Sequence, residues 1–327
     1  MTEPLQPERV LRDRYVIRRV IGRGGMGSIY LAEDNRLPGR LCALKEVHQD
    51  DSLPDPIRAE GREQFYREAS VLARLDQPNL PKVSDFFSES DRDYLVMDYV
   101  PGEDLKTLVD RARRESRVLA QDEVLNWSRQ LSDALAYLHG LDPPVIHRDI
   151  KPSNLKLTPT GVLKLVDFGL VKQMAPDEMT VTVIQGRGTA QYTPLEQYGG
   201  DIGHTDPRSD IYAFGATLYH LLTGIPPADA KQRFLRPASL RPLRELNPVI
   251  SASVERSIMW AMALHPDDRP PDVLAFRRAL LSEAPQSQSP PGRTTRPPSA
   301  IPLSRVDRAL AAAAALLFLL ALFASVR

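Results

Sequence analysis

Alternation of apolar and polar residues dominates the first hundred positions of the chain. Residues 15–21, 28–32 and 94–97 alternate with a period of two, which predicts β-strands. One helix interrupts these strands, because the apolar residues between 65 and 75 recur at helical spacing on one face. The segment 15–100 is therefore predicted to be a strand-rich unit with a single helix.

Residues 101–281 show a different pattern. Apolar residues recur three and four positions apart over 124–138, 211–222 and 254–264, which predicts helices. A strand-rich segment followed by a helix-rich segment indicates two lobes rather than alternating β-α-β units. The predicted fold class is therefore α+β and bilobal, with an N-lobe over 15–100 and a C-lobe over 101–281.

Composition changes again after residue 281. Residues 282–308 contain six prolines among serine, threonine and glutamine, which predicts a linker that spans roughly 30 Å as a flexible coil. The same prolines would also suit docking to an SH3-like domain. Residues 309–326 read ALAAAAALLFLLALFASV without a charge, and as a helix they would span about 27 Å. A helix packed on the protein would show a polar face, so we predict a C-terminal transmembrane helix.

Charge and cysteine content narrow the function classes. Lysine plus arginine and aspartate plus glutamate both number 42, so no basic field predicts a nucleic-acid partner. The single cysteine, Cys42, lies in an apolar run and is interpreted as a core residue. One cysteine and no Cys/His cluster exclude an intramolecular disulfide and a structural zinc site, which fits a reducing cytoplasm. Residues 1–14 have no apolar stretch, so they are interpreted as an N-terminal leader and not as a signal peptide.

A glycine motif lies between two predicted strands. Gly22, Gly24 and Gly27 form the pattern G-x-G-x-x-G, which dinucleotide-binding folds share when it opens a helix. Here residues 28–31 continue as a strand, so the motif is placed in a hairpin, where glycines let backbone amides approach phosphate oxygens. The alternatives are a purely structural turn and, on the glycines alone, a dinucleotide-dependent enzyme.

A lysine ends the next apolar run. Lys45 follows Ala43 and Leu44, and a lysine in this position is usually a surface residue whose stem lies along apolar surface. A functional lysine needs a carboxylate partner, and the predicted helix offers Glu68, with Glu60 and Glu63 as competing candidates. Glu68 is preferred because it lies next to the buried face of the helix. A Lys45–Glu68 ion pair would hold the ammonium group where it meets two phosphates.

The third motif carries the most information. Residues 145–154 read VIHRDIKPSN, and LVDFG follows eleven residues later. Phosphoryl transfer needs a carboxylate to orient the attacking hydroxyl, oxygen ligands for Mg²⁺ and a cation near the γ-phosphate. Asp149 supplies the first, Asn154 and Asp167 the second, and Lys151 the third.

Together these motifs resemble the eukaryotic-type (Hanks-type) protein serine/threonine kinases, especially their bacterial membrane-anchored members, over about residues 15–281. The resemblance implies a non-specific serine/threonine protein kinase that uses ATP with Mg²⁺ or Mn²⁺. Asp149 would be the catalytic base, assisted by Lys151 and Lys45, and Asn154 and Asp167 would bind the metal. The residues expected to bind the nucleotide are Ile21, Gly22, Gly24, Gly27, Ile29, Ala43, Lys45, Met97, Asp98 and Val100.

The same resemblance assigns structural positions. Asp210 would brace the catalytic loop, and Arg269 would pair with Glu196, which closes the activation segment; neither Asp210 nor Arg269 is expected to be catalytic. Residues 194–196 read Pro-Leu-Glu where the family usually has Ala-Pro-Glu. This segment shapes the pocket for the substrate residue after the target, so the departure bears on substrate preference and not on catalysis.

Three threonines suggest a switch between Gly169 and Glu196. The hypothesis is that Thr180 or Thr182 is autophosphorylated and that Arg148, a structural residue preceding the catalytic aspartate, grips the phosphate. Thr189 is expected to be a substrate-pocket hydroxyl. The alternative for each threonine is that loops are rich in this residue.

Arginines predict the orientation in the membrane. Arg305 and Arg308 flank the apolar stretch on the kinase side, against Arg327 beyond it, and a kinase domain needs cytoplasmic ATP. We therefore expect a single-pass protein of the cell membrane with its kinase domain in the cytoplasm. Since only Arg327 follows the stretch, the sequence either lacks an outer sensor domain or is a piece of a longer protein.

Expected partners are ATP, protein substrates with serine or threonine, and membrane lipid through the C-terminal helix; a homodimer is left open. The alternative to an active enzyme is a pseudokinase acting as a scaffold or ATP-binding module. Pseudokinases normally lack the lysine, the base or a metal ligand, and this chain has Lys45, Asp149, Asn154 and Asp167.

Overall fold

The computed structural model divides into two units, Met1–Glu283 and Ala284–Arg327, and the residues it describes all belong to the first. The described residues are 3–24, 27–47, 54–90, 92–167, 172–173, 190–198 and 205–282. The predicted transmembrane helix, almost all of the predicted linker, and Thr180, Thr182 and Thr189 lie outside them. Within these ranges, no helix combines the length and the apolar character needed to cross a membrane.

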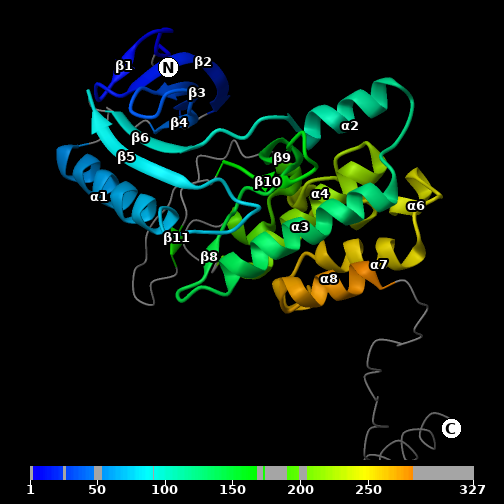
Figure 1. Cartoon of the computed structure of the whole chain (residues 1–327). Helices are drawn as coiled ribbons and strands as arrows, with labels where there is room; N and C mark the ends of the chain where they lie inside the picture. Colours follow the sequence, from blue (N-terminus) through cyan, green and yellow to red (C-terminus); the bar gives the residue numbers. More distant parts are fainter. Residues whose placement is uncertain are drawn as a thin grey trace, which may run out of the picture. The chain divides into compact units, whose positions relative to one another are not determined.

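A six-stranded antiparallel sheet forms the first lobe (Figure 1). Its order is β1-β2-β3-β4-β6-β5, and one helix, α1 (Asp55–Leu72), packs against β5 and β6. The strands are β1 (Val10–Leu11), β2 (Tyr15–Gly24), β3 (Gly27–Asp34), β4 (Leu41–Val47), β5 (Val83–Glu89) and β6 (Arg92–Asp98).

The second lobe is mainly helical. Its helices are α2 (Leu105–Arg114), α3 (Gln121–His139), α4 (Pro207–Thr223), α5 (Ala230–Leu235), α6 (Leu243–Leu246), α7 (Ala252–Ala261) and α8 (Val273–Leu281). Short strands β7 (Glu103–Asp104), β9 (Leu155–Leu157) and β10 (Leu163–Leu165) form one small sheet, and β8 (Val145–Ile146) pairs with β11 (Lys172–Gln173). Five 3₁₀ turns occur among the described residues: η1 (Pro152–Asn154), η2 (Ala190–Tyr192), η3 (Leu195–Gln197), η4 (Pro237–Ser239) and η5 (Pro266–Asp268).

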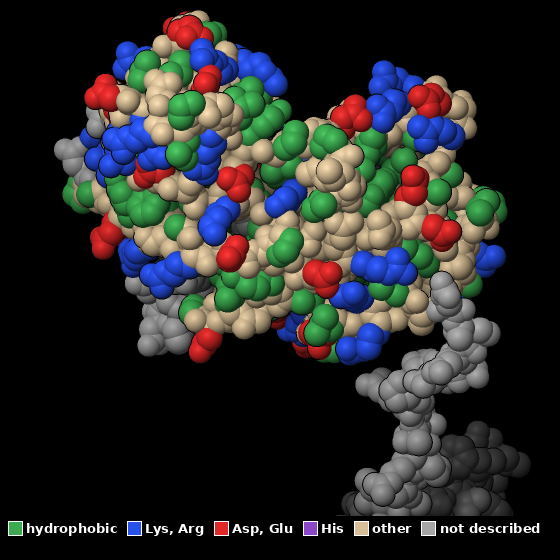
Figure 2. All heavy atoms as spheres, in the orientation of Figure 1, with side chains coloured by type: hydrophobic (Ala, Val, Ile, Leu, Met, Phe, Trp, Pro, Cys, Tyr) green, Lys and Arg blue, Asp and Glu red, His purple; other side chains and the backbone are tan. Residues whose placement is uncertain are grey.

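The predicted α+β organisation, with a strand-rich lobe followed by a helical lobe, is confirmed. The helices expected over 124–138, 211–222 and 254–264 correspond to α3, α4 and α7. Figure 2 shows that the surface is hollowed between the strand-rich lobe and the part of the helical lobe that carries α2.

The faces of the large sheet serve two different apolar clusters. On β4, Cys42 and Leu44 enter a cluster on one face of the sheet. Ala43 and Val47 join the larger core, which includes the apolar side of α1. Because successive residues of a strand alternate between faces, Lys45 lies on the α1 side. Burial also raises the pKa of the Cys42 thiol to about 12, as expected of a core cysteine.

Part of the segment 1–14, which the sequence pattern placed outside the lobes as a leader, pairs with this sheet through β1 (Val10–Leu11). Leu11 pairs with Tyr15 and is buried. The backbone N–H of Glu8 donates to the carbonyl oxygen of Ile17 at 2.7 Å. A two-residue strand is too short to produce a detectable period, so β1 could not be predicted from the residue pattern.

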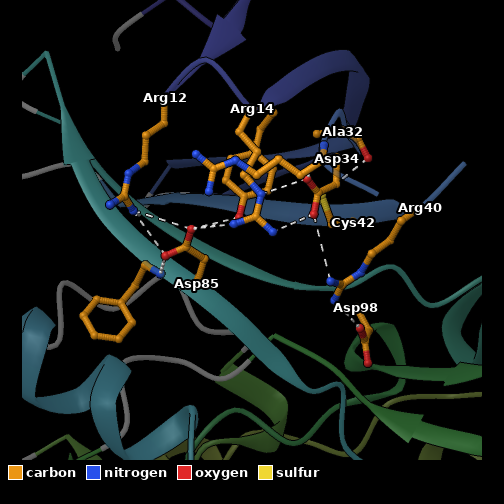
Figure 3. A network of polar contacts seen from close by, with 11 residues as sticks. Arg12, Arg14, Ala32, Asp34, Arg40, Cys42, Asp85 and Asp98 are labelled. Carbon is orange, nitrogen blue, oxygen red and sulfur yellow. Dashed lines mark hydrogen bonds and ion pairs between the residues drawn. The ribbon is translucent and has the colours of Figure 1, made fainter. Parts of the chain in front are cut away.

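A network of arginines and carboxylates fastens this N-terminal segment to the sheet (Figure 3). Arg14 donates from Nε and Nη2 to the two carboxylate oxygens of Asp34, at 2.8 and 2.7 Å. It also lies 3.5 Å from Asp85. Arg40 lies 4.0 Å from Asp34 and 3.3 Å from Asp98, so the network reaches the end of β6, where the chain leaves the first lobe.

Helix α4 is the centre of the second lobe. All its residues from Ser209 to Thr223 are buried. Asp206 caps the first turn, and Gly224 ends the helix with a left-handed φ of +72°. Gly215 allows α7 to approach, because an added Cβ would lie 2.9 Å from the Cβ of Ala261.

Candidate active site

Lys45 and Asp167 meet across the two lobes. Lys45, on β4, donates from Nζ to Oδ1 of Asp167 at 2.5 Å. Burial alone would raise the pKa of the Asp167 carboxyl, but Lys45, by its charge and its hydrogen bond, and the nearby His147 and Lys151 bring it below its usual value. The carboxylate is therefore ionised at neutral pH and can offer its oxygens to a hard cation.

Glu68 lies at the same cavity as Lys45. Both line a small cavity together with Val47, Phe65, Ala69, Leu72 and Leu95. Glu68 is buried, and its Oε1 accepts a hydrogen bond from Gln64 at 2.9 Å. Glu60 and Glu63 are exposed, so the helix turns the preferred partner inward and its two competitors outward. The predicted Lys45–Glu68 ion pair itself stays a prediction.

The catalytic loop gathers three predicted residues within hydrogen-bond distance. Lys151 Nζ lies 2.9 and 2.7 Å from the two carboxylate oxygens of Asp149. The side-chain amide of Asn154 donates to the Asp149 carbonyl at 2.8 Å and to its Oδ2 at 2.9 Å. These bonds occupy the amide nitrogen of Asn154, so its oxygen remains as a ligand atom. The turn η1 closes the loop locally, with Asn154 N donating to the Lys151 carbonyl at 3.0 Å.

Asp210, in α4, binds the backbone of this loop. Its carboxylate accepts hydrogen bonds from the backbone N–H groups of His147 and Arg148, at 2.9 and 2.8 Å. His139 Nε2 is 2.9 Å from the same carboxylate. Burial would raise the pKa of Asp210, but the hydrogen bond from His139 and the charges around it lower the pKa below its usual value. A buried ionised carboxylate with several donors fixes backbone geometry well.

Arg148 occupies an unusual environment. Its backbone is left-handed, with φ +67°. Burial lowers the pKa of its guanidinium, and the carboxylates that counteract this belong to Asp210 and Glu68. Its buried Nε has no hydrogen-bond partner among the described residues. The predicted contact with a phosphothreonine stays a prediction, since Thr180 and Thr182 lie outside the described residues.

Glu196 and Arg269 form a buried, bidentate ion pair. Arg269 Nη1 and Nη2 donate to the two carboxylate oxygens of Glu196, at 2.6 and 3.0 Å, and the Arg269 side chain is 0% exposed. Ser209, at the start of α4, adds a hydrogen bond to Glu196 at 2.8 Å. Three backbone carbonyls accept the remaining guanidinium donors. The segment 190–198 is therefore anchored at Glu196.

Three residues expected to bind the nucleotide, Met97, Asp98 and Val100, lie at the end of β6 and just after it, a stretch that we call the hinge. Met97 is buried and pairs with Ala43 of β4. Asp98 N donates to the Lys82 carbonyl at 2.9 Å, and Val100 is buried. Beyond the hinge only glycine fits at Gly102, because at φ +102° an added Cβ would lie 2.0 Å from a backbone oxygen of β9.

The glycine motif is a hairpin, as predicted. Gly22 pairs with Ile29 and Gly24 with Gly27, where β2 meets β3. A strand follows the motif, and this contradicts the dinucleotide-binding alternative, which requires a helix. Ile21 and Ile29 pack partly buried against the main core.

Asp167 and Asn154 are the two residues predicted to bind a divalent cation. No group of three or more His, Cys, Asp and Glu side chains that could hold a metal occurs in the part of the chain that the structure describes. Asp167 and Asn154 instead provide a carboxylate and an amide oxygen. A site with only two protein ligands suits Mg²⁺, which takes one or two carboxylate ligands and completes its coordination shell with phosphates and water.

Several structural residues have no signal in the sequence pattern. Asn79 donates from its amide to the Leu163 carbonyl at 2.8 Å and accepts from the Leu165 N–H at 2.8 Å, which ties β10 to the loop before β5. His139 and His220 each hold a functional segment from a helix. Each is a single polar residue whose partner is distant in sequence, so no local spacing indicates it.

Comparison with known proteins gives a consistent result. The protein kinase domain family matches residues 15–286. The chain is 33% identical over 278 residues to a probable serine/threonine-protein kinase PknB of Lactococcus lactis, covering 82% of this chain and 42% of that protein. It is 36% identical over 262 residues to serine/threonine-protein kinase PrkC of Bacillus subtilis, covering 78% and 38%. The chain thus spans about two fifths of the length of these relatives.

A solved structure agrees with the sequence relatives. The kinase domain of Mycobacterium tuberculosis PknI superimposes with a TM-score of 0.64 at 29% identity, over 85% of this chain and 98% of that domain. The family uses ATP and a divalent metal. The chain belongs to the protein kinase domain family and, within it, to the bacterial Hanks-type serine/threonine kinases.

Proposed function

We propose that this chain transfers the γ-phosphate of ATP to serine and threonine hydroxyls of protein substrates. The observation that carries the proposal is the contact of Lys45, from the strand-rich lobe, with Asp167, while Lys151 and Asn154 both donate hydrogen bonds to Asp149 in the catalytic loop. A cation, a base and two oxygen ligands of this kind are what phosphoryl transfer requires.

Each residue of the site is proposed to have its own role in the transfer. Asp149 accepts the proton of the acceptor hydroxyl as its oxygen bonds to the γ-phosphorus and the bond to the β–γ bridging oxygen breaks. Lys151, held against Asp149, places a positive charge beside the transferred group. Lys45 is proposed to bind the α- and β-phosphates, and the backbone of the glycine hairpin to cover them. Met97, Asp98 and Val100 are proposed to line the adenine site.

The metal is proposed to be Mg²⁺, with Mn²⁺ as a substitute. Asn154 and Asp167 would hold it, and when bound it neutralises charge on the phosphates. The lowered pKa of Asp167 keeps its ligand oxygens ionised before nucleotide arrives.

The test compares the purified chain with its Asp149→Asn variant, using radiolabelled ATP, Mg²⁺ and dephosphorylated casein. The asparagine side chain has the size of the aspartate and can still accept the hydrogen bond from Lys151. The variant and the wild type are therefore expected to fold alike. Label in casein that depends on Asp149 supports the kinase. Equal label in both proteins, with nucleotide bound by both, would favour the scaffold alternative.

Activation is proposed to involve autophosphorylation of Thr180 or Thr182. The support is Arg148, a largely buried guanidinium whose Nε has no hydrogen-bond partner among the described residues. A phosphate would supply a dianion with several acceptor oxygens. Full activity of a chain with both threonines changed to alanine would contradict this proposal.

Membrane tethering is proposed for residues 309–326, with the kinase domain in the cytoplasm. The support is the length and lack of charge of this stretch, together with the flanking Arg305 and Arg308. Carbonate-resistant sedimentation with membranes should be lost when residues 309–327 are deleted. Protection of the kinase domain from protease in right-side-out vesicles tests the orientation. Contact with membrane lipid is part of this proposal, and a homodimer stays a prediction.

A further inference from the structure

A buried hydrogen bond joins α4 to the segment 190–198, and the reaction above does not use it. The hydroxyl of Tyr192, in η2, lies 2.6 Å from Nδ1 of His220, near the end of α4. The two residues are only 7% and 3% exposed. Their rings also lie against each other, with centroids 6.2 Å apart.

The chemistry of the pair fixes which atom donates. Burial raises the pKa of Tyr192, so its hydroxyl keeps its proton. Burial, helped by the positive charges of Lys106 and Arg113 and opposed by Asp110, lowers the pKa of His220 to about 4. His220 is therefore neutral at physiological pH, and its Nδ1 accepts the hydrogen bond from Tyr192.

One face of α4 carries this bond together with contacts to the catalytic loop. Asp210, Thr217 and His220 are seven and three residues apart, which places them along the same side of the helix. Asp210 binds the loop just before Asp149, and Thr217 Oγ1 donates to the carbonyl of Ile150, just after it, at 3.4 Å. His220, less than one turn further along, binds Tyr192.

The segment 190–198 is thus fixed to α4 at two points. Glu196 is held by Arg269 and by Ser209 at the beginning of α4, and Tyr192 is held near its end. A protein acceptor is much larger than the hydroxyl that reacts, so it must rest on the surface around Asp149. The 190–198 segment is bound to the same helix as the catalytic loop, so it is expected to form part of that surface.

We propose that His220 is a positioning residue which, through its hydrogen bond to Tyr192, holds the 190–198 segment in register with Asp149 for a protein acceptor; this role rests on the proposed kinase activity. His220 touches neither nucleotide nor the reacting hydroxyl. Its effect is confined to how well a protein is presented to the loop, and hydrolysis of ATP by water does not depend on it.

The test separates these two acceptors. Tyr192→Phe keeps the ring and removes only the hydroxyl that donates to His220. In the purified full chain, we expect kcat/KM for casein to fall roughly five- to tenfold, the effect of one hydrogen bond. The KM for ATP and the rate of phosphate release without casein should stay at the wild-type values. His220→Leu should act like Tyr192→Phe, and His220→Asn, whose side-chain oxygen can replace Nδ1, should restore most of the activity.

A matched control lies on the same helix. Tyr219 is also buried, and its hydroxyl donates to the Arg241 carbonyl at 2.9 Å, away from the 190–198 segment. Tyr219→Phe should leave the ratio of casein phosphorylation to ATP hydrolysis unchanged. The inference is overturned if Tyr192→Phe matches the wild type, if it lowers both activities equally, or if Tyr219→Phe shows the same selective loss. A wild-type chain no more active on casein than Asp149→Asn would instead overturn the proposed kinase activity, and the inference with it.

Discussion

Acid should unfold this protein partly through His220. The unfolded chain binds a proton at this residue below its ordinary pKa of 6.5, whereas the folded chain does so only below about 4, because burial disfavours the charged ring. The stability contributed by the neutral ring is therefore complete above pH 6.5 and is lost as the pH falls towards 4. Each pH unit in this window is worth about 1.4 kcal/mol, so the loss amounts to about 3 kcal/mol.

The measurement needs a reference protein that differs from the wild type only in lacking a proton-binding group at position 220. His220→Asn keeps an acceptor for Tyr192 but cannot bind the proton, while all other titrating groups are shared with the wild type. Urea unfolding followed by the fluorescence of Trp127 and Trp260 at pH 7, 6, 5 and 4 gives the free energy of unfolding of both proteins. Between pH 7 and pH 4 the wild type should lose about 3 kcal/mol more than the variant. Parallel pH profiles would show that the folded protein accommodates a charged His220, which would refute the reasoning.

Three further predictions concern other parts of the fold. Glu196→Gln should lower the free energy of unfolding by about 3–5 kcal/mol, because the fully buried Arg269 loses its counter-charge; a loss within about 1 kcal/mol would contradict this. Gly102→Ala should lower the melting temperature more than Gly161→Ala, since both positions have positive φ but only the first would bring a Cβ against backbone, at 2.0 Å; equal shifts would count against the clash. Lys45→Met should reduce kcat for casein phosphorylation by about a hundredfold or more. Circular dichroism can check that the variant stays folded. A wild-type kcat would show that the ion pair between Lys45 and Asp167 is not needed for the reaction.

The lobes and the catalytic loop could be predicted because their signals are local. The period of two or of 3.6 residues reports burial on one side of a strand or helix, and both lobes bury such faces. Asp149, Lys151 and Asn154 lie within six residues of each other in a turn, so their spacing alone nearly determines that they meet.

Contacts between distant segments were harder to derive. The preference for Glu68 over Glu60 and Glu63 followed from the helical face, and the structure places the three glutamates accordingly. The close contact of Lys45 with Asp167 could not be obtained in this way, because the two residues are 122 positions apart. The strand β1 escaped prediction for a different reason, since two residues cannot show a period.

The polar contacts of α4 explain why a buried helix carries several polar residues. A wholly buried helix is normally apolar, because each buried polar group costs free energy unless it is hydrogen-bonded. Here Asp210, Thr217 and His220 are buried and hydrogen-bonded. Asp210 and Thr217 bind the backbone of the catalytic loop, Asp210 also binds His139 of α3, and His220 binds the Tyr192 hydroxyl. The polar residues of α4 therefore hold two irregular segments in place. The catalytic loop and the 190–198 segment therefore share one rigid support, and a substitution along this face should disturb the geometry between them before it disturbs either one alone.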